Sequence, residues 1–175
     1  YILVKQGGKI NAVGTPDKPI VMTSEKEEPG AWGGIHICGR AHTNAEGGKG
    51  SSEIGGAVYG GNDDADNSGT LQYIRLEYTG FAFDEEHEAN GISFYGVGNG
   101  TIVDHCQAYK GSDDGFEFFG GSVNVSNLVA VSCSDDSFDW TEGWNGKGTN
   151  LVAYQEAEST LGYDCDCLME CDNNG

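Results

Sequence analysis

The sequence predicts an all-β solenoid, a parallel β-helix, and three observations support this fold class. A seven-residue motif, SDDGFEF at 112–118, returns as SDDSFDW at 134–140, so the two copies are offset by 22 residues. The segments around the motif alternate apolar and polar residues, which is typical of β-strands. No stretch shows the 3.6-residue apolar period of an amphipathic helix. Short strands that return at a fixed interval, without helices between them, indicate a solenoid rather than a sheet of βαβ units.

Looser copies of the motif extend the repeat in both directions. GISFYG at 91–96 and GIHICG at 34–39 match its strand part upstream, and STLGYDC at 159–165 matches the motif downstream. A second strand recurs in step with the first, at 74–76, 106–108, 128–130 and 151–153. Coils of about 22–25 residues would then supply one strand to each of two or three sheets. An antiparallel sandwich with chance similarity between segments is the alternative.

The repeat also predicts which side chains face the core, because equivalent residues on successive coils stack into ladders. We expect two inward ladders: Ile92, Phe116, Phe138 and Tyr163 in one, and Phe94, Phe118, Trp140 and Cys165 in the other. The outward ladder between them should contain His36, Ser93, Glu117, Asp139 and Asp164. Stretches that fit no coil predict loop insertions near 40–68 and 80–90.

Composition limits the classes of partner. The chain has 175 residues, and its 9 basic and 28 acidic residues give a net charge of −19. This charge argues against a nucleic-acid partner, because phosphates are bound by Lys and Arg. No apolar run approaches the length of about 18 residues that a membrane-spanning helix needs. We expect one β-helix domain over 1–175 that is a segment of a longer chain, since the sequence opens directly into a strand-like stretch.

Motifs along almost the whole chain resemble those of a known group of proteins. The opening stretches, KINAVGT at 9–15, KPIVMTS at 18–24 and WGGI at 32–35, resemble the first coils of right-handed β-helix proteins. Further segments resemble a family of bacterial cell-surface or secreted lipoproteins of unassigned function; these segments lie at 59–62, 66–77, 90–92, 113–124 and 139–144. The resemblance implies a right-handed β-helix outside the cell, and it carries no activity to transfer. The wider pectin-lyase-like superfamily mostly binds or cuts polysaccharides, which is an analogy of fold alone.

Stacked acidic residues form the main candidate site. Six carboxylates should gather on two neighbouring coils, in the turns and on the adjoining face: Asp113, Asp114, Asp135, Asp136, Glu117 and Asp139. Strands lie ~4.8 Å apart, and two carboxylates at about 5 Å repel by roughly 3 kcal/mol at an effective dielectric constant of 20. Ca²⁺ would relieve this repulsion, because it takes six to eight oxygen ligands in irregular geometry. The alternative is that the Asp residues only form turns through their own backbone bonds.

A second acidic stretch lies at 62–69. Asp64, Asp66 and Ser68, followed by Gly69, resemble the start of an EF-hand calcium loop. The position that should offer a bidentate Glu is Arg75, and no helix flanks the loop. A simple loop rich in Asx turns is therefore the favoured interpretation, with a metal site as the alternative.

The six cysteines and one tryptophan complete the candidate residues. Disulfides, free buried thiols and a thiolate metal site at Cys165, Cys167 and Cys171 all remain open, and the sequence does not fix any pairing. We expect Cys106 to point inward, and Cys165 and Cys167 to share a strand. Trp144 lies in a Gly-rich turn and is the candidate for an exposed platform that stacks on sugar rings.

These observations favour a non-catalytic extracellular or bacterial cell-surface module. Its acidic face would bind Ca²⁺ and a glycan or protein partner. A truncated polysaccharide lyase or hydrolase is one alternative, but the His and Arg or Lys motifs that such enzymes need are not visible near the repeats. A surface filament subunit is another, because the open end of a solenoid exposes strand edges that other chains can pair with.

Overall fold

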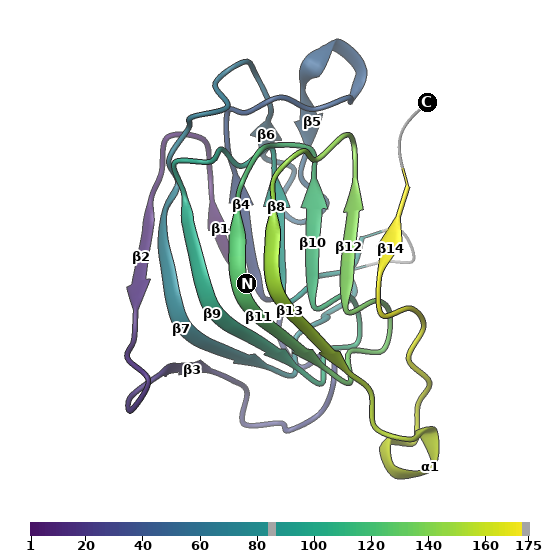
Figure 1. The fold of residues 1–175 in the computed structure, drawn as a ribbon. Helices are drawn as coiled ribbons and strands as arrows, with labels where there is room; N and C mark the ends of the chain where they lie inside the picture. The colour runs from purple at the N-terminus through teal and green to yellow at the C-terminus, as the bar shows by residue number, and fades with distance from the viewer. Residues whose placement is uncertain (84–86, 173–175) are drawn as a thin grey trace.

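The computed structural model describes residues 1–83 and 87–172 and has the predicted fold, an all-β parallel β-helix (Figure 1). Two six-stranded parallel sheets run side by side along the solenoid, one in the order β1-β4-β8-β10-β12-β14 and the other built from β2, β3, β7, β9, β11 and β13. The strands are β1 (Ile2–Val4), β2 (Ile10–Val13), β3 (Ile20–Met22), β4 (Ile35–Cys38), β5 (Gly50–Ser51), β6 (Val58–Tyr59), β7 (Gly69–Glu77), β8 (Ile92–Tyr95), β9 (Ile102–Tyr109), β10 (Phe116–Phe119), β11 (Val125–Val131), β12 (Phe138–Thr141), β13 (Gly148–Tyr154) and β14 (Glu170–Cys171). A 3₁₀ turn η1 (Glu46–Gly48) and a one-turn helix α1 (Glu158–Leu161) are the helical elements in these ranges, and neither is long or apolar enough to cross a membrane.

The strand register confirms the inward ladders from β8 to β12 on the first sheet. Phe116 pairs with Ile92 on one side and with Phe138 on the other, and all three side chains are buried. The Phe116 and Phe138 rings stack with centroids 5.5 Å apart, and the Phe94 and Phe118 rings do so at 4.9 Å. In-register pairing therefore builds a continuous aromatic core along the solenoid.

The second sheet repeats with the same regularity. Its strands place Ile74 beside Cys106 and Leu128 beside Leu151, as the sequence predicts, and Cys106 is buried. These strands bend at one position per coil, where Tyr73, His105, Asn127 and Asn150 have φ between 51° and 54°. Residues other than glycine rarely adopt this left-handed backbone conformation. Because it occurs at the same position on every coil, we infer that stacking of the coils holds it in place. Figure 1 shows the curvature of these long strands.

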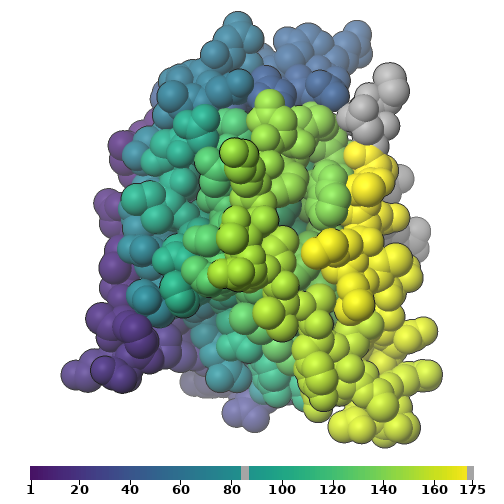
Figure 2. All heavy atoms as spheres, in the orientation of Figure 1, coloured from purple at the N-terminus to yellow at the C-terminus, as the bar shows by residue number. Residues whose placement is uncertain are grey.

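The last coil departs from the sequence prediction. The stretch 159–165 does not form a rung, because the chain leaves β13 through α1 and a left-handed Gly162 before it returns. The rung is β14, where Glu170 pairs with Asp139 and Cys171 pairs with Trp140. Asp164 is therefore not part of the outward ladder, and Tyr163 and Cys165 are not part of the inward ones. In Figure 2 this C-terminal segment (yellow) runs along one side of the solenoid.

The outward ladder is not uniformly solvent-exposed. His36 and Ser93 point away from the aromatic core, yet both are fully buried. The His36 ring lies against the Tyr1 and Tyr95 rings, and Ser93 Oγ accepts a hydrogen bond from the Asn90 amide. Further along the same face, the insertion that follows β4 carries β5 and β6 and brings in Ala57 and Tyr59. There they form a second small core with Cys38, Tyr95 and Phe119. The other predicted insertion, near 80–90, includes residues 84–86, which lie outside the described residues.

None of the six cysteines, all of which the structure describes, forms a disulfide. Cys38, Cys106 and Cys133 are buried thiols, and burial raises the pKa of both Cys106 and Cys133 to about 12. The expectation that Cys165 and Cys167 share a strand is wrong, because both lie in the irregular stretch between α1 and β14. This stretch lies outside the repeat on which the expectation rested.

The stacked core makes a direct prediction for Phe116→Ala. Removing a fully buried ring that stacks on Phe138 should lower the free energy of unfolding by about 3–5 kcal/mol. Phe81→Ala is the matched control, since Phe81 is 44% exposed, and it should change stability by less than about 0.5 kcal/mol. Urea unfolding followed by circular dichroism measures both. Equal losses in the two variants would contradict the assigned register.

Candidate functional site

The turns that precede β10 and β12 stack directly, as the repeated SDD motif predicts. The Asp136 N–H donates to Asp114 Oδ1 at 2.9 Å, and the Gly115 N–H donates to the Asp136 carbonyl oxygen at 2.8 Å. One Asp114 oxygen therefore caps the turn of the next coil. These Asp residues therefore do form turns, but the hydrogen bonds of the turns involve only some of their carboxylate oxygens.

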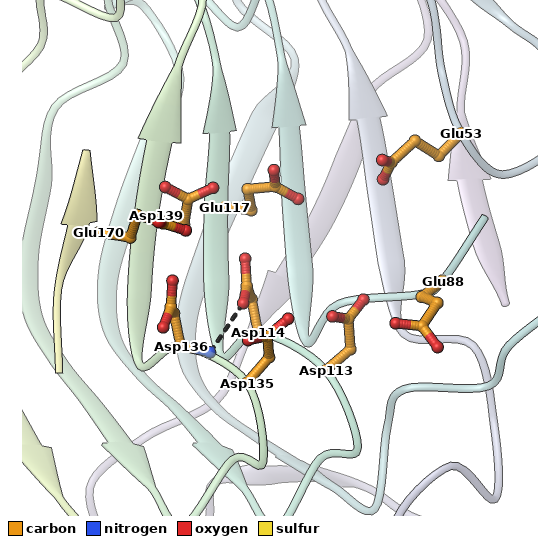
Figure 3. A pocket seen from close by; sticks show the side chains of 9 residues that line it. All are labelled: Glu53, Glu88, Asp113, Asp114, Glu117, Asp135, Asp136, Asp139 and Glu170. Atoms are coloured by element: carbon orange, nitrogen blue, oxygen red, sulfur yellow. Dashed lines mark hydrogen bonds between the residues drawn. The ribbon is translucent and has the colours of Figure 1, made fainter. Parts of the chain in front are cut away.

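Beside these turns lies a pocket of about 210 Å³ whose lining consists entirely of acidic residues (Figure 3). All six carboxylates of the main sequence prediction line it, and three more join them. The lining residues are Glu53, Glu88, Asp113, Asp114, Glu117, Asp135, Asp136, Asp139 and Glu170. Lys, Arg and His are absent from this lining, so no cationic side chain of the described residues neutralises it there.

The three added residues come from parts of the chain that the repeat does not cover. Glu53 lies in the insertion after β4, Glu88 lies shortly before β8, and Glu170 lies on the displaced last strand β14. No offset in the sequence relates them to the SDD motif. The alternating outward position of Glu117 and Asp139 would have indicated Glu170, had the length of the last coil been known.

Three trios of carboxylates in the pocket have ligand atoms that all lie within 4.8 Å of one another. The trios are Asp113–Asp114–Asp135, Asp114–Glu117–Asp139 and Asp136–Asp139–Glu170. A Ca²⁺ ion has oxygen ligands at 2.3–2.6 Å, so oxygens on opposite sides of one ion lie about 5 Å apart. Each trio is therefore compact enough to contribute ligands to a single ion of this kind.

Burial and mutual repulsion shift the proton affinity of these acids upward. Burial, followed by the charges of Glu88 and Asp135, raises the pKa of Asp113 to about 7. Burial and the charge of Asp113 raise the pKa of Asp114 to about 9. Burial also raises the pKa of Glu117 well above its usual range, with Asp114 as the next cause. Without a counter-ion, part of the cluster holds protons near neutral pH.

Two buried oxygen atoms beside the pocket lack a hydrogen-bond donor. The Asn90 amide donates to Glu117 Oε2 at 2.6 Å and to Ser93 Oγ at 3.0 Å, while its own Oδ1 has no partner. Asp139 Oδ1 is likewise enclosed and has no donor within the described ranges, although the Asp139 and Glu117 carboxyl groups are close enough to share a proton. Buried acceptors are normally satisfied, because leaving one without a partner costs about 1–3 kcal/mol.

Comparison with known proteins agrees with this fold. A family model described as a pectate-lyase-like beta helix domain matches residues 1–175, the whole chain. The chain belongs to this family. No curated protein and no solved structure matches it significantly.

The second acidic stretch of this pectate-lyase-like β-helix does not join the pocket. Asp64 Oδ1 accepts hydrogen bonds from the His42 backbone and ring, at 3.1 and 2.9 Å, and these bonds lower the pKa of Asp64. Asp66 accepts from the Arg40 N–H at 3.2 Å and from Ser68 Oγ at 3.3 Å. In the part of the chain that the structure describes, neither belongs to a trio of potential metal ligands. The loop has the partners of a structural Asx-rich loop.

Trp144 is half-buried rather than an exposed platform. Its ring stacks on Phe118 at 4.5 Å between centroids, and its Nε1–H donates to the Val123 carbonyl oxygen at 3.1 Å. It lies next to Trp140, with centroids 5.9 Å apart. One face of the indole is thus used by the core of the β-helix, so the structure gives little support for Trp144 as a sugar-stacking residue.

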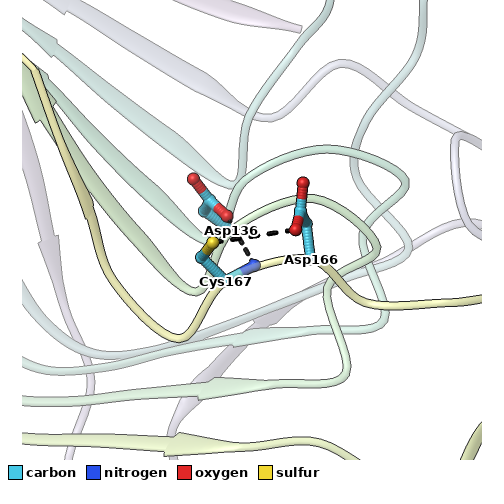
Figure 4. Close-up of side chains that lie close together, drawn as sticks. All are labelled: Asp136, Asp166 and Cys167. Carbon is cyan, nitrogen blue, oxygen red and sulfur yellow. Dashed lines mark hydrogen bonds between the residues drawn. The ribbon is translucent and has the colours of Figure 1, made fainter.

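Two carboxylates and a thiol, those of Asp136, Asp166 and Cys167, form a small cluster at the edge of the acidic pocket (Figure 4). The Cys167 N–H donates to Asp136 Oδ1 at 2.8 Å, and its thiol approaches Asp166 Oδ1 at 3.6 Å. Asp136 therefore faces both the pocket and this cluster. Asp166 and Cys167 are exposed, so water can solvate the cluster more easily than the pocket.

The raised pKa values predict how stability depends on pH in the absence of divalent cations. Asp114 binds its proton up to about pH 9 in the folded state, whereas its ordinary pKa is 3.8. Between these values the folded state holds more protons than the unfolded state, so the free energy of unfolding should fall as pH rises. Asp114→Asn should weaken this fall, and Asp17→Asn, at an exposed position, should not. Urea unfolding in EDTA between pH 4.5 and 8.5 tests this. A pH-independent stability in the wild type would contradict it.

Proposed function

We propose that this chain is a non-catalytic β-helix module, located outside the cell or on a bacterial cell surface, whose acidic pocket binds Ca²⁺. The observation that carries the proposal is the pocket lined by nine carboxylates with no cationic side chain among its lining residues. The rigid solenoid would present this pocket to a glycan or protein partner.

The electrostatics of the pocket support a bound cation. Two ionised carboxylates about 5 Å apart repel by roughly 3 kcal/mol at an effective dielectric constant of 20, and the pocket contains several such pairs. Bound protons relieve part of this repulsion up to neutral pH, as the raised pKa values of Asp113 and Asp114 indicate. A divalent cation would replace these protons and would also supply a partner for the enclosed Asp139 Oδ1.

The donor set favours Ca²⁺ over other common ions. Every lining residue offers carboxylate oxygen, which suits hard cations, whereas Zn²⁺ prefers nitrogen and sulfur ligands. Mg²⁺ requires near-ideal octahedral geometry at 2.0–2.1 Å, and Ca²⁺ accepts six to eight ligands in irregular arrangements. The carboxylates come from two turns, three strands (β10, β12 and β14) and two insertions, so they form an irregular set.

A polysaccharide-cleaving enzyme has less support from this pocket. A lyase requires a base, such as Lys or Arg, facing the metal, and the described lining contains neither. Paired carboxylates alone are not distinctive, since in-register strands always place equivalent acids about 5 Å apart. Binding without catalysis therefore accounts for the pocket more simply.

Calcium should stabilise the folded chain. If Ca²⁺ binds only the folded state, free ion at a hundred times Kd adds ~2.7 kcal/mol to the free energy of unfolding. The Tm in millimolar CaCl₂ should therefore exceed the Tm in excess EDTA. Asp135→Asn, which removes one exposed pocket carboxylate, should reduce the difference, while Asp17→Asn should leave it unchanged. The proposal fails if the wild-type Tm is the same in calcium and in EDTA.

A further inference from the structure

A second cavity, of about 460 Å³, lies next to the acidic pocket and shares Glu53 with it. Residues 51–56 of the insertion after β4, together with Phe83 and His87, form its described lining. In Figure 3, Glu53 and Glu170 lie at opposite ends of the acidic row, so this cavity adjoins the end that is remote from β14. A volume of this size is within the range of pockets that hold small ligands.

Three aromatic rings gather at this cavity. The Phe83 ring lies edge to face with the Phe81 ring, with centroids 5.0 Å apart and planes at 80°. It lies edge to face with the Tyr1 ring as well, at 5.7 Å and 73°. All three side chains are exposed, although burying such rings is favourable. Exposed apolar groups that gather in one place, rather than singly, mark a surface that binds a partner or ligand.

The backbone of the insertion brings the Tyr1 ring to the wall of the cavity. Gly55 lines the cavity and has a φ of 79°, a left-handed conformation that glycine adopts readily. A Cβ atom added to Gly55 would lie 2.8 Å from Leu3 Cδ2 and 3.4 Å from the Tyr1 hydroxyl oxygen. Tyr1 therefore lies next to both the Phe83 ring and the wall that the insertion forms.

Charge decides which class of ligand this cavity takes. The chain has a net charge of −19, Glu53 places a carboxyl group in the lining, and Lys and Arg are absent from the described lining. Anions are therefore disfavoured, whereas the negative faces of aromatic rings attract cations. We propose that the cavity binds a small organic cation with a quaternary ammonium group, held by Tyr1, Phe81, Phe83 and Glu53. The inference goes beyond the proposed function, because this ligand needs no metal ion.

A quaternary ammonium group fits these walls better than a primary amine or a metal ion. A primary ammonium group has three N–H donors and a hard cation requires several oxygen ligands, and phenyl rings satisfy neither. A quaternary ammonium group carries its charge on a surface of methyl groups, which pack against aromatic faces. Rings that stand edge to face lie in different planes, so they can contact such a group from more than one side.

Isothermal titration calorimetry with choline chloride at pH 8, in the presence of EDTA, tests this inference. At this pH the imidazole of His87 is mostly uncharged if it keeps its ordinary pKa of about 6.5. The comparison ligand is 3,3-dimethyl-1-butanol, which has the shape of choline with carbon in place of the charged nitrogen. We expect one choline to bind per chain, at least about tenfold more tightly than the neutral alcohol.

Side-chain variants locate the binding. Phe83→Leu keeps an apolar side chain but removes the ring, so it should weaken choline binding about tenfold and change binding of the neutral alcohol little. Glu53→Gln removes only the charge and should also weaken choline selectively. Tyr154→Leu is the matched control, because Tyr154 is a 59% exposed ring on β13, outside the lining. Phe83 is itself exposed, so its replacement should not prevent folding, and circular dichroism checks this.

Three results would overturn the inference. Equal affinities for choline and the neutral alcohol would show that the cavity is merely apolar. Choline binding that is unchanged in Phe83→Leu would place the ligand elsewhere. Absence of choline binding up to 50 mM would exclude the site. Because EDTA is present throughout, each of these results leaves the proposed calcium binding untouched, and a failure of calcium to bind would leave this inference standing.

Discussion

In-register parallel stacking of successive coils is the constraint on which the rest of this structure depends. Each strand pairs residue for residue with its neighbours, so whatever occupies one position lies about 4.8 Å from its equivalent on the next coil. For Phe116 and Phe138 this geometry is favourable, because two buried rings stack. For Asp114 and Asp136 the same geometry is unfavourable, because it brings like charges together. The register that builds the core therefore also builds the acidic pocket.

The regular coils could be predicted from the sequence, because residues that stack in one ladder are separated by a fixed number of positions along the chain. The offset of 22 residues placed Phe116 over Phe138 and Glu117 beside Asp139, and the structure confirms both pairs. The same reasoning gave six of the nine pocket carboxylates. The signal was the repetition of the Ser-Asp-Asp turn within the chain, at 112–114 and 134–136.

The irregular parts could not be predicted in this way. The detour through α1 lengthens the last coil, so Glu170 rather than Asp164 follows Asp139 in the ladder. Glu53 reaches the pocket from the insertion after β4, and the same insertion packs Tyr59 against Tyr95. Insertions obey no period, and their path is determined by packing between residues that are distant in sequence. Trp144 likewise contacts Phe118 through a turn whose direction the repeat does not specify.

We propose that cations hold the stacked carboxylates of this pectate-lyase-like β-helix together. A crystal structure grown in CaCl₂, with anomalous data collected at long wavelength, tests it most directly. Bound calcium should give anomalous density between the acidic side chains, with one Asp139 oxygen within 2.3–2.6 Å of an ion. A pocket without anomalous density, in which the carboxylates pair through shared protons or bind only water, would contradict it.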